Sequence, residues 1–442
     1  MHKSFFIKTY GCQMNNYDSE KINDLLVLNG FERTDDVENT DIAILNTCHI
    51  REKASEKLYS DLGRLSIYKK NREKLGKKLS IVVMGCVAQA EGEEIVNRNN
   101  SVDYVVGPQN IQAIPTLLKK KDFEKVHIDF LSEEKFKSLT FSQSNKISRL
   151  ITVQEGCDKF CSFCVVPYTR GAEFSRPLED IYAEINDAVE KGCTEVTLLG
   201  QNVSSYESNI YEGKEKKVQL GNLCNTIAKI PNLKRIRYLT SHPNDIDNNL
   251  IDEHANNKKL MPFLHLPIQS GSDKILKAMN RKHTQRQYIE LTKKIKLAVP
   301  QMAFSSDFIV GYPGETDEDF ENTISVVNTV KFASSYSFIY SARPGTPASI
   351  QKDFNSEEVK KKRLKYLQKI LNIHQNNFNK KLLDKEVEVL ITDFGKKEDQ
   401  YVGRTPHLQP VHVFSSKNII GRILNIKIER LTSFSFHGKI LN

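Results

Sequence analysis

The feature that most constrains this chain is a group of three cysteines within eight residues. Cys157, Cys161 and Cys164 are spaced by four and three positions and follow a predicted strand that ends at Val153. Thiolates are soft donors that suit a [4Fe–4S] cluster, and three of them leave one iron open. A structural zinc site closes its shell with a fourth Cys or His, and none lies nearby. The spacing therefore favours a catalytic cluster, held by these three residues, over zinc or free thiols.

A second group of three cysteines is spread over the first part of the chain. Cys12, Cys48 and Cys86 are far apart, but each comes at the end of a predicted strand. In a parallel sheet the carboxyl ends of neighbouring strands lie at one edge, where ligands usually bind. This placement predicts a second cluster, with buried inert cysteines as the alternative. Cys193 and Cys224 are not grouped with other cysteines, and we expect them to be packing residues.

Three patterns of secondary structure follow one another along the chain. Up to about residue 120, and again at 147–371, short apolar runs alternate with helical spacing, which predicts parallel sheets covered by helices. From about residue 379, short strands separated by turn residues predict a small closed β-barrel. We expect an α/β protein with an N-terminal parallel α/β sheet domain (2–119), a central partial (β/α) barrel (143–375) and a C-terminal all-β barrel (378–441), with the charged stretch 119–145 as a connector. The predicted strands are 5–10, 42–46, 81–84 and 104–106; then 150–153, 195–199, 235–239, 263–267, 304–310 and 336–340; then 387–391, 400–402, 411–414 and 422–428.

Cysteine usage and hydropathy indicate a cytoplasmic protein without a membrane partner. In a reducing cytosol, cysteines grouped in this way serve metal binding or catalysis rather than disulfides. Neither a membrane-spanning run nor a signal peptide is visible. The 64 Lys and Arg against 55 Asp and Glu give a net charge of +9, which permits a nucleic-acid partner without establishing one.

Polar and glycine-containing motifs follow four strands of the predicted central barrel, at 200–202, 240–243, 269–271 and 311–316. Active sites of parallel barrels gather at the carboxyl ends of the strands, where small residues let the backbone approach a ligand. Each motif alone is equally consistent with a plain turn and with a ligand-binding segment. Their repetition at one edge of the predicted barrel favours a cofactor site. The candidate cofactor-binding residues are Gly200, Gln201, Asn202, Ser241, Gln269, Gly311 and Glu315, together with Phe163 in the cysteine loop.

The loop of Cys157, Cys161 and Cys164, with the aromatic Phe163 before its last cysteine, resembles the signature of the radical S-adenosylmethionine superfamily. In that superfamily the open iron chelates the amino and carboxylate groups of the cofactor. Electron transfer into the sulfonium then releases a 5′-deoxyadenosyl radical. The resemblance implies that the protein positions the reactants and excludes water.

A three-cysteine N-terminal domain, a radical core and a C-terminal barrel similar to the RNA-binding TRAM domain together resemble the methylthiotransferases over nearly the whole chain. Within that family, the segments 165–171 and 173–177 are similar to the branch of tRNA-2-methylthio-N6-dimethylallyladenosine synthases. The segment 403–410 departs from the pattern. Further matching segments are 11–15, 46–48, 155–157, 199–203, 266–272 and 311–316.

The resemblance implies methylthiolation of C2 of N6-isopentenyladenosine at position 37 of tRNA, with two [4Fe–4S] clusters and two S-adenosylmethionine molecules. The radical removes hydrogen from C2. The cluster on Cys12, Cys48 and Cys86 presents sulfur, to which the second cofactor adds a methyl group. Because C2 of a purine has no acidic proton, general-base catalysis would not suffice. The implied partners are the tRNA anticodon stem-loop, a sulfur donor and an electron donor such as flavodoxin or ferredoxin. In the last domain the candidate phosphate contacts are Arg404, His407, Lys417 and Arg422, with plain surface charge as the alternative.

Three other functions are to be weighed. Two are methylthiotransferases for threonylcarbamoyl-adenosine in tRNA or for an aspartate of a ribosomal protein, and the segment 165–171 argues against both. The third is a non-catalytic iron–sulfur protein that binds RNA or senses redox state. Such a protein would need neither an open iron nor a cofactor rim.

Overall fold

The computed structural model divides the chain into two compact units. Unit 1 consists of residues 1–143, 154–158 and 164–176, and unit 2 of residues 144–153, 159–163 and 177–442. The cysteine loop is thereby divided, since Cys157 and Cys164 belong to unit 1 and Cys161 belongs to unit 2. The three-domain division with its bounds stays a prediction. The described residues are 3–49, 52–119, 124–131, 135–136, 144–211, 215–433 and 435–441, so much of the expected connector at 119–145 lies outside them.

Unit 1 is built on a six-stranded parallel sheet with the order β2-β1-β3-β4-β5-β6. The four inner strands confirm the predicted ones, whereas the two edge strands have only two residues each and were not predicted. The strands are β1 (Ser4–Thr9), β2 (Glu32–Arg33), β3 (Ile42–Thr47), β4 (Ser80–Gly85), β5 (Tyr104–Val106) and β6 (Val126–His127).

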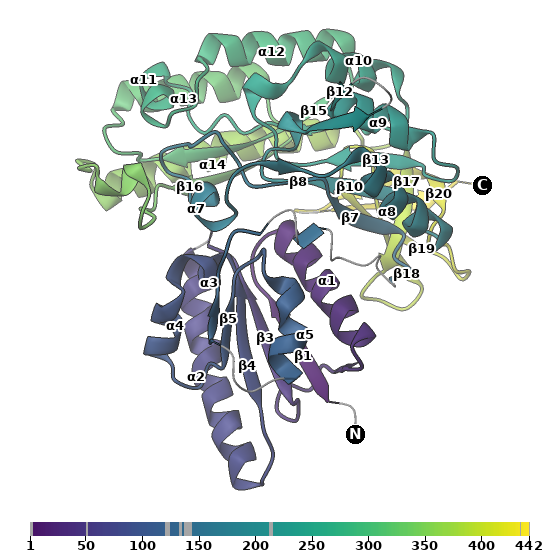
Figure 1. Cartoon of the computed structure of the whole chain (residues 1–442). Helices are drawn as coiled ribbons and strands as arrows, with labels where there is room; N and C mark the ends of the chain where they lie inside the picture. Colours follow the sequence, from purple (N-terminus) through teal and green to yellow (C-terminus); the bar gives the residue numbers. More distant parts are fainter. Residues whose placement is uncertain are drawn as a thin grey trace. The chain divides into compact units, whose positions relative to one another are not determined.

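Helices cover both faces of this sheet (Figure 1). The division follows from strand alternation: Ile44 and Val82 face the core under α1 and α5, whereas Leu45 and Val83 face the core under α2, α3 and α4. The helices are α1 (Gln13–Leu28), α2 (Glu52–Lys74), α3 (Cys86–Glu91), α4 (Glu93–Arg98) and α5 (Ile114–Lys119).

Six parallel strands of unit 2 form the predicted partial barrel. They lie in two three-stranded sheets, β13-β10-β7 and β14-β15-β16, which a backbone bridge between Ile236 and Leu260 connects. All six were predicted; the hairpin of β11 (Glu207–Tyr211) and β12 (Glu215–Gln219) was not. The strands are β7 (Ser148–Thr152), β10 (Glu195–Leu199), β13 (Arg235–Tyr238), β14 (Phe263–His265), β15 (Ala303–Val310) and β16 (Ser334–Ile339).

Helices that follow these strands bury the main core of unit 2. Val196, Leu198 and Ile236 alternate with polar residues along their strands and join this core. None of the helices among the described residues combines the length and the apolar content that a bilayer crossing requires. The helices are α8 (Leu178–Glu190), α9 (Leu220–Ala228), α10 (Asn248–Asn256), α11 (Asp273–Ala278), α12 (Gln285–Ala298), α13 (Asp317–Val330) and α14 (Glu357–Lys380).

The end of the chain forms a closed five-stranded barrel with the order β17-β18-β19-β21-β20. Its core includes Val389, Ile391, Val411 and Ile426. The first four strands confirm the prediction, and the fifth, β21, was missed. The strands are β17 (Glu386–Phe394), β18 (Gln400–Arg404), β19 (Pro410–Phe414), β20 (Ile423–Leu431) and β21 (Phe436–Ile440).

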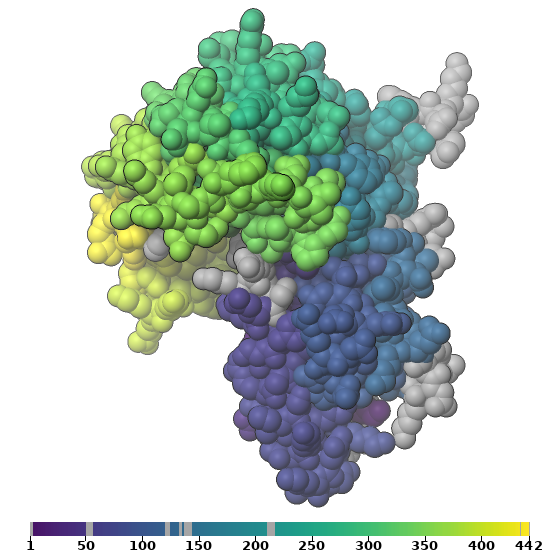
Figure 2. Space-filling model, turned by 90° about the vertical axis from the view of Figure 1, so that its left-hand side faces the viewer, coloured from purple at the N-terminus to yellow at the C-terminus, as the bar shows by residue number. Residues whose placement is uncertain are grey.

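Within unit 2 the C-terminal barrel, coloured yellow-green to yellow in Figure 2, packs against the central barrel. Arg235 donates from Nη1 to the carbonyl of Arg404 (2.7 Å) and from Nη2 to that of Glu388 (3.2 Å). Arg237 donates from Nη2 to the carbonyl of Thr405 (2.8 Å). Because Arg235 begins β13, this contact lies at the amino ends of the barrel strands, away from the predicted cofactor rim.

Candidate cluster and cofactor sites

The three N-terminal cysteines lie together at the carboxyl ends of adjacent strands. Cys12 comes three residues after β1, and Cys48 and Cys86 directly follow β3 and β4. The side chains of Cys12 and Cys48 lie near enough to influence each other's ionisation, and the charge of Cys12 acts on Cys86. The structure thus brings together the three thiols that the sequence grouped. Their role as ligands stays a prediction.

Two glycines make this convergence possible. Gly11 has φ +102°, and a Cβ there would lie 2.6 Å from the sulfur of Cys48. Gly85 has φ +94°, and a Cβ there would lie 2.4 Å from the carbonyl oxygen of Thr47. L side chains rarely adopt this backbone region, so only glycine permits such close approach. The glycine before the cysteine is therefore part of the site at two of the three strand ends.

The Cys12 thiol is acidified by its surroundings. The nearby side chain of Cys48 and the charge of Arg170 lower the pKa of Cys12 to about 6, against the opposing effect of burial. Burial raises the pKa of Cys86, and Arg170 opposes that rise. Cys12 is also the N-cap of the 16-residue helix α1, a position that favours negative charge. Thiolate is the form that binds metals, so the lowered pKa favours the form of Cys12 that the predicted ligand role requires.

The chemistry of the three donors suits an iron–sulfur cluster. In a [4Fe–4S] cluster each thiolate binds a different iron, so its ligands lie farther apart than those of one zinc ion. Three soft donors at one sheet edge, one of them acidified, match the cluster.

Four buried charged side chains lie beside these thiols in unit 1. Arg170 binds Asp18 (Nη2–Oδ2 2.8 Å) and Glu155 (Nη1–Oε1 3.0 Å). Lys135 binds the other oxygens of the same carboxylates, Oδ1 of Asp18 (2.9 Å) and Oε2 of Glu155 (2.8 Å). None of the four side chains is more than 2% exposed. We call this set the buried quartet; it was not predicted, because charged residues are exposed by default.

The cysteine loop is held within each unit by hydrogen bonds. In unit 1, the backbone N–H of Cys157 donates to the carbonyl of Gly171 (3.3 Å). In unit 2, Arg281 donates from Nη1 to the sulfur of the buried Cys161 (3.4 Å). The amide of Asn280 donates to the carbonyl of Phe160 (2.9 Å), which holds Phe160 at φ 48°. The roles of Cys157, Cys161 and Cys164 as ligands stay predictions.

Nine buried polar atoms of unit 2 have no hydrogen-bond partner among the described residues, and four of them belong to two short segments, 241–242 and 281–283. These four are Oγ of Ser241, Nε2 of His242, Nε2 of His283 and Nε of Arg281. The rings of His242 and His283 meet edge to face at 5.7 Å. Unpaired polar groups are costly in a protein interior, so a polar ligand is the expected partner. Arg281 also donates to the sulfur of Cys161, so these polar atoms lie in the same unit as one of the predicted cluster ligands. Their donor and acceptor types fit the amino, carboxylate and hydroxyl groups of S-adenosylmethionine.

Of this group, sequence analysis named Ser241 as a candidate and included His242 in the motif 240–243 without assigning it a role. Arg281 and His283 were missed because they lie outside the motifs that follow the strands. Burial, followed by the charge of Arg281, lowers the pKa of His283 to about 4, and burial also lowers that of His242. Both rings are therefore neutral at pH 7 and can either accept or donate a proton in a hydrogen bond.

Three other predicted rim residues make structural contacts. Asn202 is buried and donates from Nδ2 to Asp245 (2.6 Å). Gly200 accepts from the hydroxyl of Thr240 at its carbonyl (2.6 Å). Phe163 packs against a small apolar cluster that contains Tyr312. Gln201 lies half-buried between Gly200 and Asn202. Binding of the cofactor by these residues stays a prediction.

Gln269 continues the barrel wall beyond β14. Its N–H donates to the carbonyl of Asp307 (3.0 Å), and its carbonyl accepts from Ile309 (2.9 Å). It has φ 77°, which turns the chain at the strand end. This backbone role does not require the amide side chain, so the side chain remains a candidate for cofactor binding.

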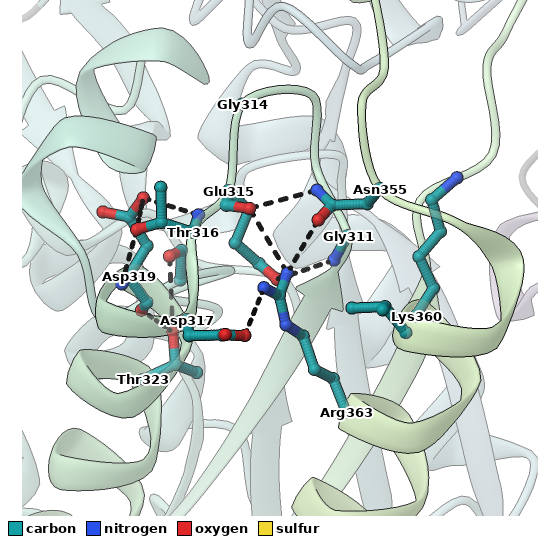
Figure 3. Close-up of polar contacts among 12 residues, drawn as sticks. Gly311, Gly314, Glu315, Thr316, Asp317, Asp319, Thr323, Asn355, Lys360 and Arg363 are labelled. Atoms are coloured by element: carbon teal, nitrogen blue, oxygen red, sulfur yellow. Dashed lines mark hydrogen bonds and ion pairs between the residues drawn. The ribbon is translucent and has the colours of Figure 1, made fainter.

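Glu315 is engaged by an internal network (Figure 3). Its Oε1 accepts from Nη1 of Arg363 (2.7 Å) and from the N–H of Gly311 (3.0 Å). Arg363 also binds Asp317 (2.7 Å). The Glu315 side chain is 1% exposed, and burial raises its pKa. These contacts attach the turn at 311–316 to α14 and give Glu315 an anchoring role; cofactor binding by Glu315 or Gly311 stays a prediction.

Two of the four candidate phosphate contacts point inward. Arg404 is half-buried and donates to the carbonyl of Leu408 (3.3 Å). His407 bonds the carbonyl of Gln301 (2.9 Å). Both lie in the segment 403–410 that departs from the family pattern and docks on the central barrel. Lys417 and Arg422 are exposed, so they remain candidates.

The two remaining cysteines are buried. Cys193 is 1% and Cys224 0% exposed, and burial raises the pKa of both thiols. A raised pKa disfavours the thiolate that metals require. Both residues belong to the core of unit 2, in agreement with their expected packing role.

Three families match parts of the chain. Residues 4–107 match the uncharacterized protein family UPF0004, residues 151–327 the radical SAM superfamily and residues 380–441 the TRAM domain. A tRNA-2-methylthio-N(6)-dimethylallyladenosine synthase of Orientia tsutsugamushi (strain Boryong) is 50% identical over 448 residues, covering 100% of this chain and 99% of that protein. One of Rickettsia prowazekii (strain Madrid E) is 49% identical over 447 residues, covering 100% of both.

Solved structures share the fold at low identity. The radical S-adenosylmethionine methyltransferase TsrM from Kitasatospora setae, with cobalamin and a [4Fe–4S] cluster bound, has a TM-score of 0.58 and 13% identity, covering 79% of this chain and 77% of that one. The cobalamin-dependent radical enzyme OxsB has a TM-score of 0.55 and 11% identity, covering 84% and 56%. These similarities concern the fold alone.

Proposed function

From the premise that the chain belongs to the family of tRNA-2-methylthio-N6-dimethylallyladenosine synthases, we propose that it methylthiolates C2 of N6-isopentenyladenosine at position 37 of tRNA. The observation that carries this proposal is 50% identity, over the whole chain, to an enzyme of that name. The protein is a radical S-adenosylmethionine enzyme, and its cofactors include an iron–sulfur cluster and S-adenosylmethionine.

Two clusters are proposed, one on each cysteine group. Cys157, Cys161 and Cys164 would hold the first, and the N-terminal group at the sheet edge would hold the second. When bound, the first cluster supplies the electron that cleaves S-adenosylmethionine to the 5′-deoxyadenosyl radical, and the second supplies sulfur. The acidified thiol of Cys12 and the three converging strand ends support the second assignment.

The residues of unit 2 contribute binding and orientation. Arg281 supplies a positive charge and an N–H to Cys161, which stabilises the extra negative charge of a reduced cluster. Ser241, His242 and His283 offer unpaired polar atoms to the cofactor. The neutral histidines carry no positive charge that would repel the cofactor's sulfonium.

The tRNA is proposed to approach the C-terminal barrel on a face that includes Lys417 and Arg422. Both side chains are exposed, whereas the segment 403–410 is occupied by docking on the central barrel. Anticodon loops present bases that can leave their stack and enter a pocket, which C2 chemistry requires. A low-potential electron donor such as flavodoxin or ferredoxin and a separate sulfur donor complete the reaction, which we place in the cytoplasm.

Mass spectrometry of digested tRNA tests the reaction. A strain that lacks the gene should accumulate N6-isopentenyladenosine and lose its 2-methylthio derivative, and the gene in trans should restore it. Unchanged 2-methylthio-isopentenyladenosine would refute the substrate assignment. Loss of a methylthio group from threonylcarbamoyl-adenosine instead would favour the other tRNA branch.

Two cysteine variants separate the two proposed clusters. Cys161→Ala should abolish formation of 5′-deoxyadenosine from S-adenosylmethionine in reduced, reconstituted protein. Cys48→Ala should keep that cleavage but lose the methylthiolated product. Equal cleavage by Cys161→Ala would exclude the radical function of the triplet, and methylthiolated product from Cys48→Ala would exclude the role of the N-terminal group.

A further inference from the structure

Asn15 connects the buried quartet with the ends of the strands that carry the N-terminal cysteines. Its Nδ2 donates to the carbonyls of Tyr10 (3.1 Å) and Thr47 (2.8 Å), which precede Cys12 and Cys48. Its Oδ1 accepts from the Cys12 sulfur (3.5 Å) and from Nη2 of Arg170 (3.3 Å). One buried amide therefore fixes two strand ends, one thiol and the guanidinium.

Arg170 and Lys135 occupy the same carboxylates in different ways. Arg170 uses a planar fork that reaches Asp18, Glu155 and Asn15 at once. Lys135 takes the opposite carboxylate oxygens and lies over the ring of Phe136 at 5.5 Å. Only an arginine can serve so many acceptors in one plane.

Stability alone does not explain this arrangement. A set of buried ion pairs is often no more stable than apolar side chains of the same volume, because desolvation offsets the attraction. The quartet does join separate parts of unit 1. Asp18 lies on α1, six residues after Cys12, and Glu155 lies two residues before Cys157. The backbone of Arg170 is itself fixed, since its carbonyl accepts from the buried Gln109 (2.6 Å).

We propose that Arg170 is a positioning residue for the N-terminal cysteine group: it orients Asn15, which accepts from Cys12, and, through Glu155, it ties this group to the segment of Cys157. The inference rests on the proposed function, in which Cys12, Cys48 and Cys86 hold a cluster. Side chains that bond to cluster sulfurs tune the reduction potential and fix the ligands. Loss of Arg170 therefore changes the cluster itself, whereas loss of Lys135 only weakens the fold.

The test uses the full chain with Cys157, Cys161 and Cys164 all changed to Ala, so that bound iron reports the N-terminal group alone. Arg170→Met, Arg170→Lys and the matched control Lys135→Met are added to this parent. Each protein is reconstituted anaerobically. Iron and sulfide per chain, the electron paramagnetic resonance spectrum of the reduced cluster, its midpoint potential and the thermal unfolding midpoint are then measured.

The parent and Lys135→Met should both bind about four irons, the content of one [4Fe–4S] cluster, with the same spectrum and potential. Arg170→Met should lose more than half of the iron, or keep it with an altered spectrum and a more negative potential. Arg170→Lys, which keeps the charge without the fork, should fall between them. Both methionine variants should melt earlier.

The outcomes separate this inference from its premise. A parent without iron overturns the cluster assignment and the inference with it. A parent with four irons whose Arg170→Met variant matches Lys135→Met in iron, spectrum and potential overturns the positioning role alone. If Arg170→Met does not fold, the comparison of Arg170→Lys with Lys135→Met decides in the same way.

Discussion

Nη1 of Arg281 donates a hydrogen bond to the sulfur of Cys161 across 3.4 Å, with both side chains buried. In the N-terminal group, Nη2 of Arg170 donates to Oδ1 of Asn15 (3.3 Å), which also accepts from the sulfur of Cys12 (3.5 Å). Each proposed cluster site is thus accompanied by one buried guanidinium that comes from a different part of the chain than the thiol it serves.

Arg281→Met should make the cluster on the triplet harder to reduce. The lost N–H and positive charge both favour the reduced form, so we expect the midpoint potential to fall by roughly 50 mV. The measurement is a potentiometric titration in a full chain with Cys12, Cys48 and Cys86 changed to Ala. Arg286→Met is the control, since that side chain is 87% exposed and pairs with Glu290. Equal potentials in the two variants would contradict the role of Arg281.

Glu315→Gln should destabilise unit 2 far more than Asp317→Asn. Both carboxylates bind Arg363 at 2.7 Å, but their side chains are 1% and 94% exposed. Removing one member of a buried pair leaves an uncompensated charge and costs about 3–5 kcal/mol, whereas an exposed pair contributes at most about 1 kcal/mol. Urea unfolding monitored by circular dichroism measures both. Similar losses in the two variants would show that Glu315 does not anchor α14.

Arg237→Met should loosen the C-terminal barrel. Arg237 binds Glu195 (2.8 Å) and donates to the carbonyls of Thr405 (2.8 Å) and Pro406 (2.7 Å), so its loss leaves several buried groups unpaired. We expect limited trypsin digestion to cut near Lys380 at least several-fold faster. Arg430→Met, at an exposed position of β20, should leave the cleavage rate unchanged. Unaltered digestion of Arg237→Met would count against this docking contact.

The stability of unit 2 should fall as the pH drops from 7.5 to 5.5, in part through His242 and His283. Their pKa values are lowered in the folded state, that of His283 to about 4, whereas an unfolded histidine titrates near 6.5. Above pH 6.5 neither state takes up these protons. Below pH 6.5 the histidines of the unfolded chain take up protons, whereas those of the folded chain stay neutral. The free energy of unfolding therefore falls by about 1.4 kcal/mol per pH unit for each histidine.

The double variant His242→Gln/His283→Gln isolates this effect. It should lose about 3 kcal/mol less than the unaltered protein between pH 7.5 and 5.5, measured by urea unfolding at both values. Parallel pH profiles of the two proteins would show that these histidines titrate normally.

Inner strands could be predicted from sequence because buried parallel strands are continuous apolar runs. β4, with Ile81, Val82 and Val83, is such a run. β21 was missed because His437, Gly438 and Lys439 interrupt its apolar pattern. Its residues form a strand because they pair with β20, although their own strand propensity is low.

The convergence of Cys12, Cys48 and Cys86 could be inferred because strand ends fall at one edge of a parallel sheet. The buried quartet could not be inferred. The burial of Lys135 depends on Asp18, 117 residues away, and on Glu155. No local pattern in the sequence reports such a partner, and isolated charged residues are normally solvated.

The distribution of the cysteines has a consequence for maturation. Cys157, Cys161 and Cys164 lie so near one another along the chain that an unfolded polypeptide already offers all three. Cys12, Cys48 and Cys86 become neighbours only when β1, β3 and β4 have aligned, because each thiol comes from a different strand end. Iron delivery to the cluster proposed for the N-terminal group would therefore wait until these strands have paired, whereas the cluster proposed for the triplet could receive iron while the chain is still emerging from the ribosome.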